Sequence, residues 1–292
     1  MVVEFTDGFE SGDINKWDEV IVSECQVTVE TVSPKFGTRH LRSTSIAGTA
    51  QKRGCVAKFF ADAQVKFCRG YFQLNPIPPT GQRPSLIGLY PAVGYPANFY
   101  VSVGLGEFGE TTPPTLRCDY RDAGVTKSAV TGISLDPNKY YCLEVGVKVG
   151  AGTGEVHLWL DGQEVVTITG VNNAEWAGIG LARVGIIFAD ATLPATTVDV
   201  DEVAIGTSYI GPVVAPKPCW IATAAFLSPV APQLNYLRHF RDQYLPDHVV
   251  ETYYRTSPPI ADYISKHERI RIAIREVINF GIKLLRALHV VH

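Results

Sequence analysis

The feature that most constrains the fold is a run of alternating side chains, YYCLEVGVKVGAGTGEVHLWLDGQEVVTITG, which spans Tyr140–Gly170. Apolar residues recur at a period of two on both sides of GAGTG, which is typical of strands with one buried face. Asp161-Gly162 then supplies the positive-φ dipeptide that favours a tight hairpin turn. The run therefore predicts a three-stranded antiparallel meander.

A similar pattern extends from Val2 to about Pro212, where short runs of residues that favour β-strands are separated by Gly, Pro, Asn and Asp. So many strands without a convincing helix predict a mainly β fold, either a sandwich or a barrel. Further candidate strands are residues 20–31, 54–60, 64–73, 85–90, 98–105, 115–121, 181–188 and 197–205.

The segment GPVVAPKP (Gly211–Pro218) has three prolines in eight residues, which is typical of a stiff linker between domains. We therefore predict a β domain over 1–212, a linker over 213–218 and a helical domain over 219–292. Helical spacing follows the linker, with one helix ending at Pro246 and another broken at Ser257-Pro258-Pro259. The last helix, about 268–290, is apolar but interrupted by charges, so it is not expected to span a membrane. It is expected either to pack in its own bundle or to present an amphipathic face for self-association or a membrane surface.

The charge pattern limits the class of partner. The net charge of -3 argues against binding nucleic acid through phosphate contacts. From Cys219 onward nine Lys and Arg oppose six Asp and Glu, giving +3, whereas the rest carries 17 and 23, giving -6. The first residues, MVVEFTDGFESGD, have neither a basic nor an apolar leader region, so no signal peptide is expected in this chain.

Three motifs carry a family resemblance: FTDGFESGDINKW (Phe5–Trp17), EVHLWLDGQEV (Glu155–Val165) and VDVDEVAIG (Val198–Gly206). In this order and spacing they resemble the opening, middle and closing signatures of concanavalin A-like jelly rolls, the laminin-G-like and lectin/glucanase sandwiches. The resemblance covers roughly residues 3–212. It implies an antiparallel jelly-roll β-sandwich that binds sugar or another surface ligand on its concave face. We separately expect an extracellular or cell-surface location.

The resemblance also implies a structural calcium ion where the first and last strands meet. Ca²⁺ prefers carboxylate and carbonyl oxygens, and the candidate ligands are Asp7, Glu10, Asp199 and Asp201. The alternative is a solvated turn in which these carboxylates cap backbone amides.

The tail carries a second resemblance. CWIATAAFLSPVAPQLNYLRHFRDQYL, followed by YYRTSPPIADYISKHERIR, closely resembles the C-terminal module named the CFI-box. The match runs from Cys219 to about Leu288, and Trp220 replaces the phenylalanine of the module's second position. The resemblance implies no particular activity. Cys219 is expected to pack among small residues, to form a covalent link such as a disulfide, thioether or lipid attachment, or to act as a nucleophile.

Motifs for glycan chemistry are sparse. Hydrolysis needs two carboxyl groups flanking the scissile bond, and the strand motif ExDxxE that supplies them in the glucanase branch does not occur. The alginate-lyase branch needs Arg, Gln-x-His and Tyr, and no QxH is present. We therefore expect a non-enzymatic surface protein that binds carbohydrate or a surface ligand and self-associates through 219–292. The alternatives are a structural subunit of an extracellular assembly and a glycan-active hydrolase or lyase.

Two further sets of residues are candidates for binding or cross-linking. Tyr90, Tyr95 and Tyr100 are candidates for stacking on sugar rings, against the alternative that they fill the core. The pairs Cys55 with Cys68 and Cys118 with Cys142 are candidates for cross-strand disulfides, against the alternative of buried free thiols.

Overall fold

The computed structural model describes residues 2–92, 98–106, 114–213, 219–227 and 232–287. The chain divides into two compact units, Met1–Val213 and Val214–His292.

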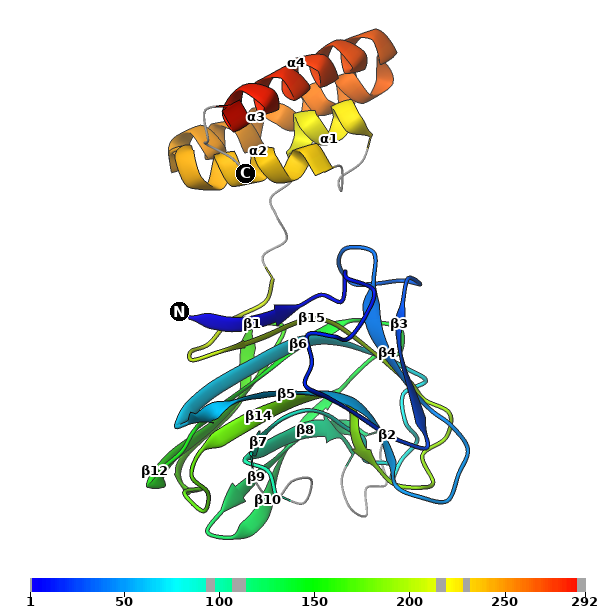
Figure 1. The fold of residues 1–292 in the computed structure, drawn as a ribbon, viewed down its shortest axis with the longest axis vertical. Helices are drawn as coiled ribbons and strands as arrows, with labels where there is room; N and C mark the ends of the chain where they lie inside the picture. The colour runs from blue at the N-terminus through cyan, green and yellow to red at the C-terminus, as the bar shows by residue number, and fades with distance from the viewer. Residues whose placement is uncertain (1, 93–97, 107–113, 214–218, 228–231, 288–292) are drawn as a thin grey trace. The chain divides into compact units, whose positions relative to one another are not determined.

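Among its described residues, the first unit has fifteen antiparallel strands in two layers (Figure 1). One sheet has the order β13-β12-β11-β6-β15-β4-β3, with β1 added alongside β15. The strands of this eight-stranded sheet are β1 Val3–Asp7, β3 Cys25–Glu30, β4 His40–Ser45, β6 Val65–Asn75, β11 Tyr141–Lys148, β12 Ala151–Leu160, β13 Gln163–Asn172 and β15 Thr197–Gly206. The seven-stranded sheet has the order β10-β9-β8-β7-β14-β5-β2. Its strands are β2 Glu19–Ser23, β5 Lys52–Ala63, β7 Ser85–Pro91, β8 Val101–Leu105, β9 Thr115–Asp122, β10 Val125–Ser134 and β14 Ile179–Ala189.

The predicted meander is confirmed by β11, β12 and β13, in which Val145 lies opposite Leu158, and Leu158 opposite Val166. Asp161 and Gly162 form the hairpin turn with φ values of 51° and 86°, as their positive-φ preference predicts. The alternating apolar residues of both sheets meet in one buried core between the layers. The mainly β sandwich expected from the sequence is therefore confirmed.

The predicted strand 20–31 is wrong as a single element. Its first half, β2, pairs with β5 in the seven-stranded sheet, whereas its second half, β3, pairs with β4 in the other sheet. The chain changes layer at Glu24, whose φ of 45° turns the backbone sharply. Each layer gains an edge strand in this way.

The residues after β15 form a strap on the outer face of the eight-stranded sheet, which we define as residues 207–213. The buried Glu144 carboxylate accepts hydrogen bonds from the backbone N–H groups of Ile210 at 2.7 Å and Gly211 at 2.8 Å. Arg69 donates to the Gly211 carbonyl at 3.0 Å. The Val213 N–H donates to the Tyr71 hydroxyl at 2.8 Å. The strap thus supplies partners to two buried charged side chains on the outer face of the sheet, Glu144 and Arg69.

The described ranges of the second unit, 219–227 and 232–287, form four helices, α1 Trp220–Phe226, α2 Pro232–Tyr244, α3 Asp247–Lys266 and α4 Glu268–Ala287. Within the described part of the chain, no helix is both long and apolar enough to cross a bilayer.

The predicted break at Ser257-Pro258-Pro259 is wrong, because α3 runs through both prolines. Packing on either side of them holds the helix together: the Ile221 N–H donates to the Tyr253 hydroxyl at 3.2 Å, and Ala261 and Ile264 are buried. Tertiary contacts therefore override the local helix-breaking preference.

Candidate functional site

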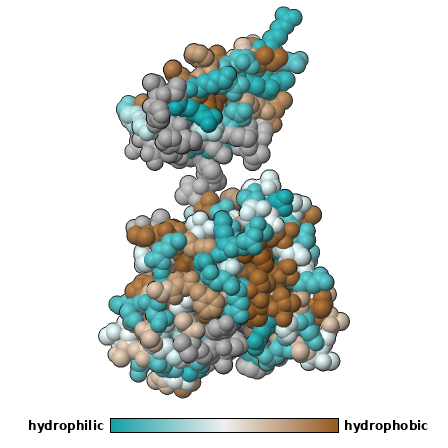
Figure 2. All heavy atoms as spheres, in the orientation of Figure 1, coloured by the Kyte–Doolittle hydropathy of each residue, from teal (hydrophilic) through white to brown (hydrophobic). Residues whose placement is uncertain are grey.

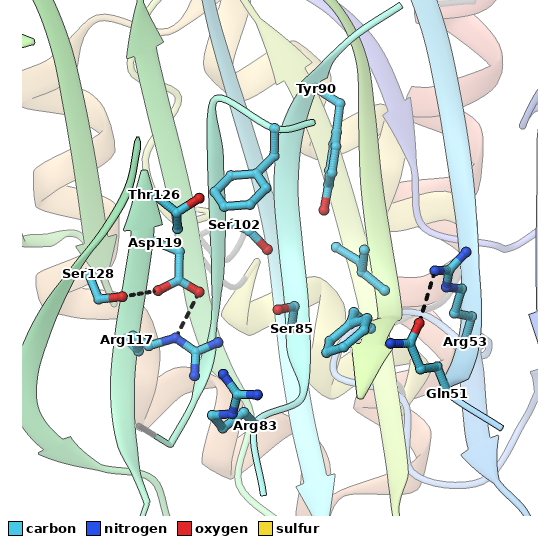
Figure 3. A pocket seen from close by; sticks show the side chains of 13 residues that line it. Gln51, Arg53, Arg83, Ser85, Tyr90, Ser102, Arg117, Asp119, Thr126 and Ser128 are labelled. Atoms are coloured by element: carbon cyan, nitrogen blue, oxygen red, sulfur yellow. Dashed lines mark hydrogen bonds and ion pairs between the residues drawn. The ribbon is translucent and has the colours of Figure 1, made fainter. Parts of the chain in front are cut away.

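A hollow with a volume of about 510 Å³ lies on the outer face of the seven-stranded sheet. Strand alternation explains its floor. On β8, Val101, Val103 and Leu105 point into the core, so Ser102 points to the opposite face and into the pocket. Figure 3 shows Ser85 and Ser102 at the floor, with larger side chains around them.

An aromatic wall stands at one end of this pocket. Tyr90 on β7 and Phe99 just before β8 meet edge to face, with ring centroids 6.5 Å apart. Tyr90 is 2% exposed, and its hydroxyl points into the pocket (Figure 3). Gly88 makes room for it, because a Cβ at Gly88 would lie 3.1 Å from the Tyr90 hydroxyl and 2.7 Å from the Val101 carbonyl oxygen.

The Tyr90 hydroxyl lies in an unusual electrostatic setting. The Arg183 guanidinium lies 5.0 Å from the centre of the Tyr90 ring. Burial raises the pKa of Tyr90 to about 12, while the hydrogen bond with Ser102 and the positive charge of Arg183 act in the opposite direction. At neutral pH the group is therefore a phenol, and nearby cations stabilise the phenolate that it forms on losing a proton.

A basic wall stands at the other end of the pocket. Arg117 and Asp119 project from β9 on the same face, joined by a hydrogen bond of 2.9 Å, and Ser128 on β10 donates to the second Asp119 oxygen at 2.6 Å. Arg117 also donates to the carbonyl oxygens of Leu105 and Gly106. These partners fix the guanidinium in place.

Arg83 lies beside Arg117 at this wall (Figure 3), with Asp190 at 3.6 Å. Burial lowers the pKa of the Arg83 guanidinium; Asp190 opposes this effect and the positive charge of Arg117 adds to it. Arg53 lies at the far side of the pocket, where it donates to Gln51 at 3.4 Å.

The described residues lining the pocket comprise three guanidinium groups and one carboxylate, so their formal charge is three minus one, or +2. Such a surface attracts a polyanion. It offers a tyrosine hydroxyl next to cations, which suits proton transfer at a carbon beside a carboxylate. It does not offer the carboxyl pair of a glycoside hydrolase, because Asp119 is the only carboxylate among the described lining residues.

The three tyrosines expected to bind sugar have different outcomes. Tyr90 lines the pocket. Tyr100 is wrong as a ligand-binding residue, because it is fully buried in the core and contacts the Trp176 ring at 5.1 Å. Tyr95 lies outside the described residues.

Sequence reasoning missed most of the pocket, including its arginines. A signal was present in β9, TLRCDYRD, where Arg117, Asp119 and Arg121 alternate with Leu116 and Cys118. Charged side chains on the outer face of a strand that is paired on both sides mark a candidate binding surface. The other signal was Arg183, a fully buried arginine within the apolar run of β14.

The four predicted calcium ligands do not form one metal site. Within the described ranges, no three acidic, histidine or cysteine side chains lie close enough to share a metal ion. Asp7 accepts hydrogen bonds from the Trp17 indole at 2.8 Å and the Phe9 N–H at 3.0 Å. Asp199 forms a two-pronged ion pair with Arg42 at 2.7 and 2.8 Å. Burial alone would raise the pKa of Asp199, but Arg42 and His40 outweigh it and the pKa is lowered. Asp7 and Asp199 therefore do not fit calcium.

Glu10 and Asp201 instead hold one loop by its backbone. Glu10 accepts from the N–H groups of Thr38 at 2.8 Å and Arg39 at 3.0 Å, and Asp201 accepts from Phe36 at 2.9 Å. Burial raises the pKa of Asp201 to about 6, and the negative charge of Glu202 adds to this. Calcium at Glu10 and Asp201 stays a prediction.

The predicted disulfides are not formed, since all six cysteines are free and buried. Cys55 and Cys142 lie on the outer faces of their sheets, whereas Cys68 and Cys118 point into the core between the layers. Each predicted pair thus joins two sheets and two opposite faces, so its members are not cross-strand neighbours. The alternative of buried free thiols describes them. Burial raises the pKa of Cys55 and Cys142 to about 12, which keeps both thiols protonated.

In the helical unit, Cys219 is a buried free thiol that packs with Ala222 and Leu234. An Arg241 nitrogen lies 3.9 Å from its sulfur. Trp220 is 39% exposed and stands outside this cluster.

Comparison with known proteins shows which solved structures have a similar fold. No protein-family model matches the chain, and the curated proteins contain no match, so the CFI-box resemblance stays a prediction. Endo-β-1,4-glucuronan lyase from the fungus Trichoderma reesei is similar in structure, with a TM-score of 0.55 and 18% identity over 71% of this chain and 96% of that chain. The sandwich shares the fold of a polysaccharide lyase. Cellulose-induced protein Cip1 is similar too, with a TM-score of 0.53 and 15% identity over 72% of this chain and 100% of that chain.

The glucuronan lyase among these neighbours corrects the functional expectation. The prediction of a non-enzymatic surface protein is contradicted, because a protein with this fold is a polysaccharide lyase. ExDxxE and QxH are local motifs, whose residues lie close together along one strand. The pocket gathers its residues from different strands instead, so such motifs do not report on it.

Proposed function

We propose that the chain is a glycan-active enzyme, a lyase that cleaves a uronate-containing polysaccharide by β-elimination in the pocket of the seven-stranded sheet. The observation that carries the proposal is that the Tyr90 hydroxyl and the guanidinium groups of Arg53, Arg83 and Arg117 line the same hollow. The fold shared with a glucuronan lyase supports it.

Each residue has a role that follows from its chemistry. In β-elimination a base removes the proton from the sugar carbon that bears the carboxylate, and the bond to the neighbouring glycosidic oxygen breaks. The negative charge that develops on the carboxylate needs cationic neighbours. Arg83 and Arg117 supply positive charge at one wall, and Arg53 supplies it at the far side.

Tyr90 is the proposed acid–base group. Its phenolate takes the proton from carbon, and the resulting phenol returns a proton to the departing glycosidic oxygen, so that one group serves both steps. Arg183 beneath the ring stabilises the phenolate. Phe99 offers an apolar face to a sugar ring beside it.

Hydrolysis is the less favoured glycan chemistry, because the described part of the pocket lacks a second carboxylate. The two reactions leave different products. A lyase creates a carbon–carbon double bond conjugated with the carboxylate, which absorbs ultraviolet light, whereas a hydrolase creates reducing ends without this absorbance.

The test is to incubate the full chain with polyglucuronate, alginate, polygalacturonate and neutral cellulose. Ultraviolet absorbance and reducing ends are then measured together. The proposal expects both signals to rise with at least one uronate polymer and neither with cellulose. Reducing ends without absorbance would indicate hydrolysis, and no product from any polymer would reject an enzyme of this class.

A further inference from the structure

Helix α4 carries an apolar stripe that the described residues of its own unit leave uncovered. We define the stripe as Ala273, Val277, Phe280 and Leu284, whose spacing of four, three and four places them along one side of the helix. Val277 is 70% exposed, Phe280 69% and Leu284 51%. Three large apolar side chains in a row on one helix are more than the scattered single ones of an ordinary surface.

The side of α4 that packs within the unit is a different one. Ile282 is buried, and Ile278 packs against the cluster of Cys219, Ala222 and Leu234. The helix thus has one apolar side inside its unit and a second one outside. Hydrophobic patches are visible among hydrophilic ones on the surface of this unit in Figure 2.

The stripe is complementary to itself when two copies of α4 run antiparallel about a two-fold axis between residues 278 and 279. Val277 then lies opposite Phe280 of the second copy, and Ala273 opposite Leu284. Each contact joins a small side chain to a large one, and the symmetry repeats each contact. This alternation of small and large is what close packing of two helices requires.

The residues flanking the stripe also match. Glu276 and Lys283 are both exposed and lie on the same flank. In the antiparallel arrangement Glu276 lies beside Lys283 of the second copy, and the pair occurs twice. On the other flank, no described atom beyond the helix's own backbone lies within 4 Å of a Cβ built at Gly281, so a second helix can approach closely there.

We propose that α4 is a homodimerisation helix, which binds α4 of a second copy of this chain in antiparallel orientation through the stripe. The proposal does not depend on the enzymatic activity. A single helix pair buries less area than a standard interface, so we expect a dissociation constant on the order of 10–100 µM.

The test is sedimentation velocity and equilibrium of the full chain under reducing conditions, from about 1 µM to about 1 mM, a range that brackets this affinity. The wild type should shift from monomer to dimer. Phe280→Glu, which places two charges in the stripe, should weaken the dimer about 100-fold or more. Ile272→Glu is the matched control, because Ile272 is 49% exposed on α4 but lies outside the stripe, and it should change the affinity of the dimer far less than Phe280→Glu does.

A charge exchange tests the orientation. Glu276→Lys puts like charges together twice and should weaken the dimer about tenfold. Glu276→Lys combined with Lys283→Glu restores opposite charges and should return the affinity to within about threefold of the wild type. Both positions are on the surface, and circular dichroism checks that each variant keeps its helices.

Three results would overturn the proposal. The first is a wild type that stays monomeric over the whole concentration range. If the sedimentation coefficient of the Phe280→Glu monomer then differs from that of the wild-type monomer, another part of the same chain covers the stripe. The second is equal weakening by Phe280→Glu and Ile272→Glu. The third is failure of the double exchange to recover what Glu276→Lys loses.

Discussion

Replacing Tyr90 by Phe removes one oxygen from the pocket and leaves the rest of its wall in place. The ring keeps its edge-to-face contact with Phe99 and its position over Arg183. The hydrogen bond with Ser102 is lost, which costs about 1 kcal/mol of folding stability. If Tyr90 transfers the proton, kcat should fall by about 10²–10⁴-fold, the usual contribution of a general acid–base group.

The pH profile gives a second, independent expectation. The pKa of Tyr90 is raised to about 12, so only the small phenolate fraction of the free enzyme is competent as a base at neutral pH. As long as the pH is below this pKa, the phenolate fraction grows tenfold with each unit by which the pH rises. The kcat/KM of the wild type should therefore rise about tenfold from pH 7 to pH 8 and again to pH 9.

The assay follows the ultraviolet absorbance of the unsaturated product with the uronate polymer that the full chain cleaves. Tyr209→Phe is the matched control, because Tyr209 is 38% exposed and its hydroxyl donates to the Gly162 carbonyl at 3.2 Å, outside the pocket. Full activity of Tyr90→Phe, or a kcat/KM that falls from pH 7 to pH 9, would refute the role of Tyr90.

Three further predictions follow from the sandwich. Arg83→Gln should raise KM for the anionic polymer about tenfold with a small change in kcat, because Arg83 supplies charge rather than a proton; steady-state kinetics at low salt measures this. Gly88→Ala should lower stability by about 1–3 kcal/mol and reduce activity, since the added Cβ meets Val101 and Tyr90; thermal unfolding and the same assay test both, and an unchanged melting temperature would contradict the packing. The raised pKa of Asp201 means that the folded state favours the neutral carboxyl group. The wild type should therefore lose stability relative to Asp201→Asn as the pH rises from 3.8 to about 6. The total loss should be about 3 kcal/mol. Calorimetry at pH 4 and pH 7 checks the sign, and repeating it with added Ca²⁺ tests calcium at Asp201, because a bound cation would remove the difference.

Much of the fold could be predicted from local patterns, because strand alternation and turn formation depend on residues that are neighbours in the sequence. The meander from Tyr140 to Gly170 was predictable because a period of two and an Asp-Gly turn act within a few residues. The division of residues 20–31 between two sheets was not, because it depends on the pairing of β2 and β3 with distant strands. The continuity of α3 through Pro258 and Pro259 likewise depends on what the helix packs against.

The pocket was harder to predict for the same reason. The sequence pointed to Tyr90 as an aromatic ring that could stack on a sugar, but it did not point to the arginines that share its pocket. Arg53, Arg83 and Arg117 come from sites far apart in the chain, and only the order of strands in the sheet brings them together. A sequence shows which face of a strand is polar, but the neighbour of that strand is a property of the fold.

The strap over residues 207–213 determines where the sandwich can be cut from the rest of the chain. A fragment that ends with β15 at Gly206 would leave the buried Glu144 without its two backbone donors and Arg69 without the Gly211 carbonyl. Losing partners of buried charges costs several kcal/mol. A fragment that extends to Val213 keeps these contacts and the hydrogen bond to Tyr71. The last residues of the unit therefore belong to its folded structure, and a study of the sandwich alone should retain them.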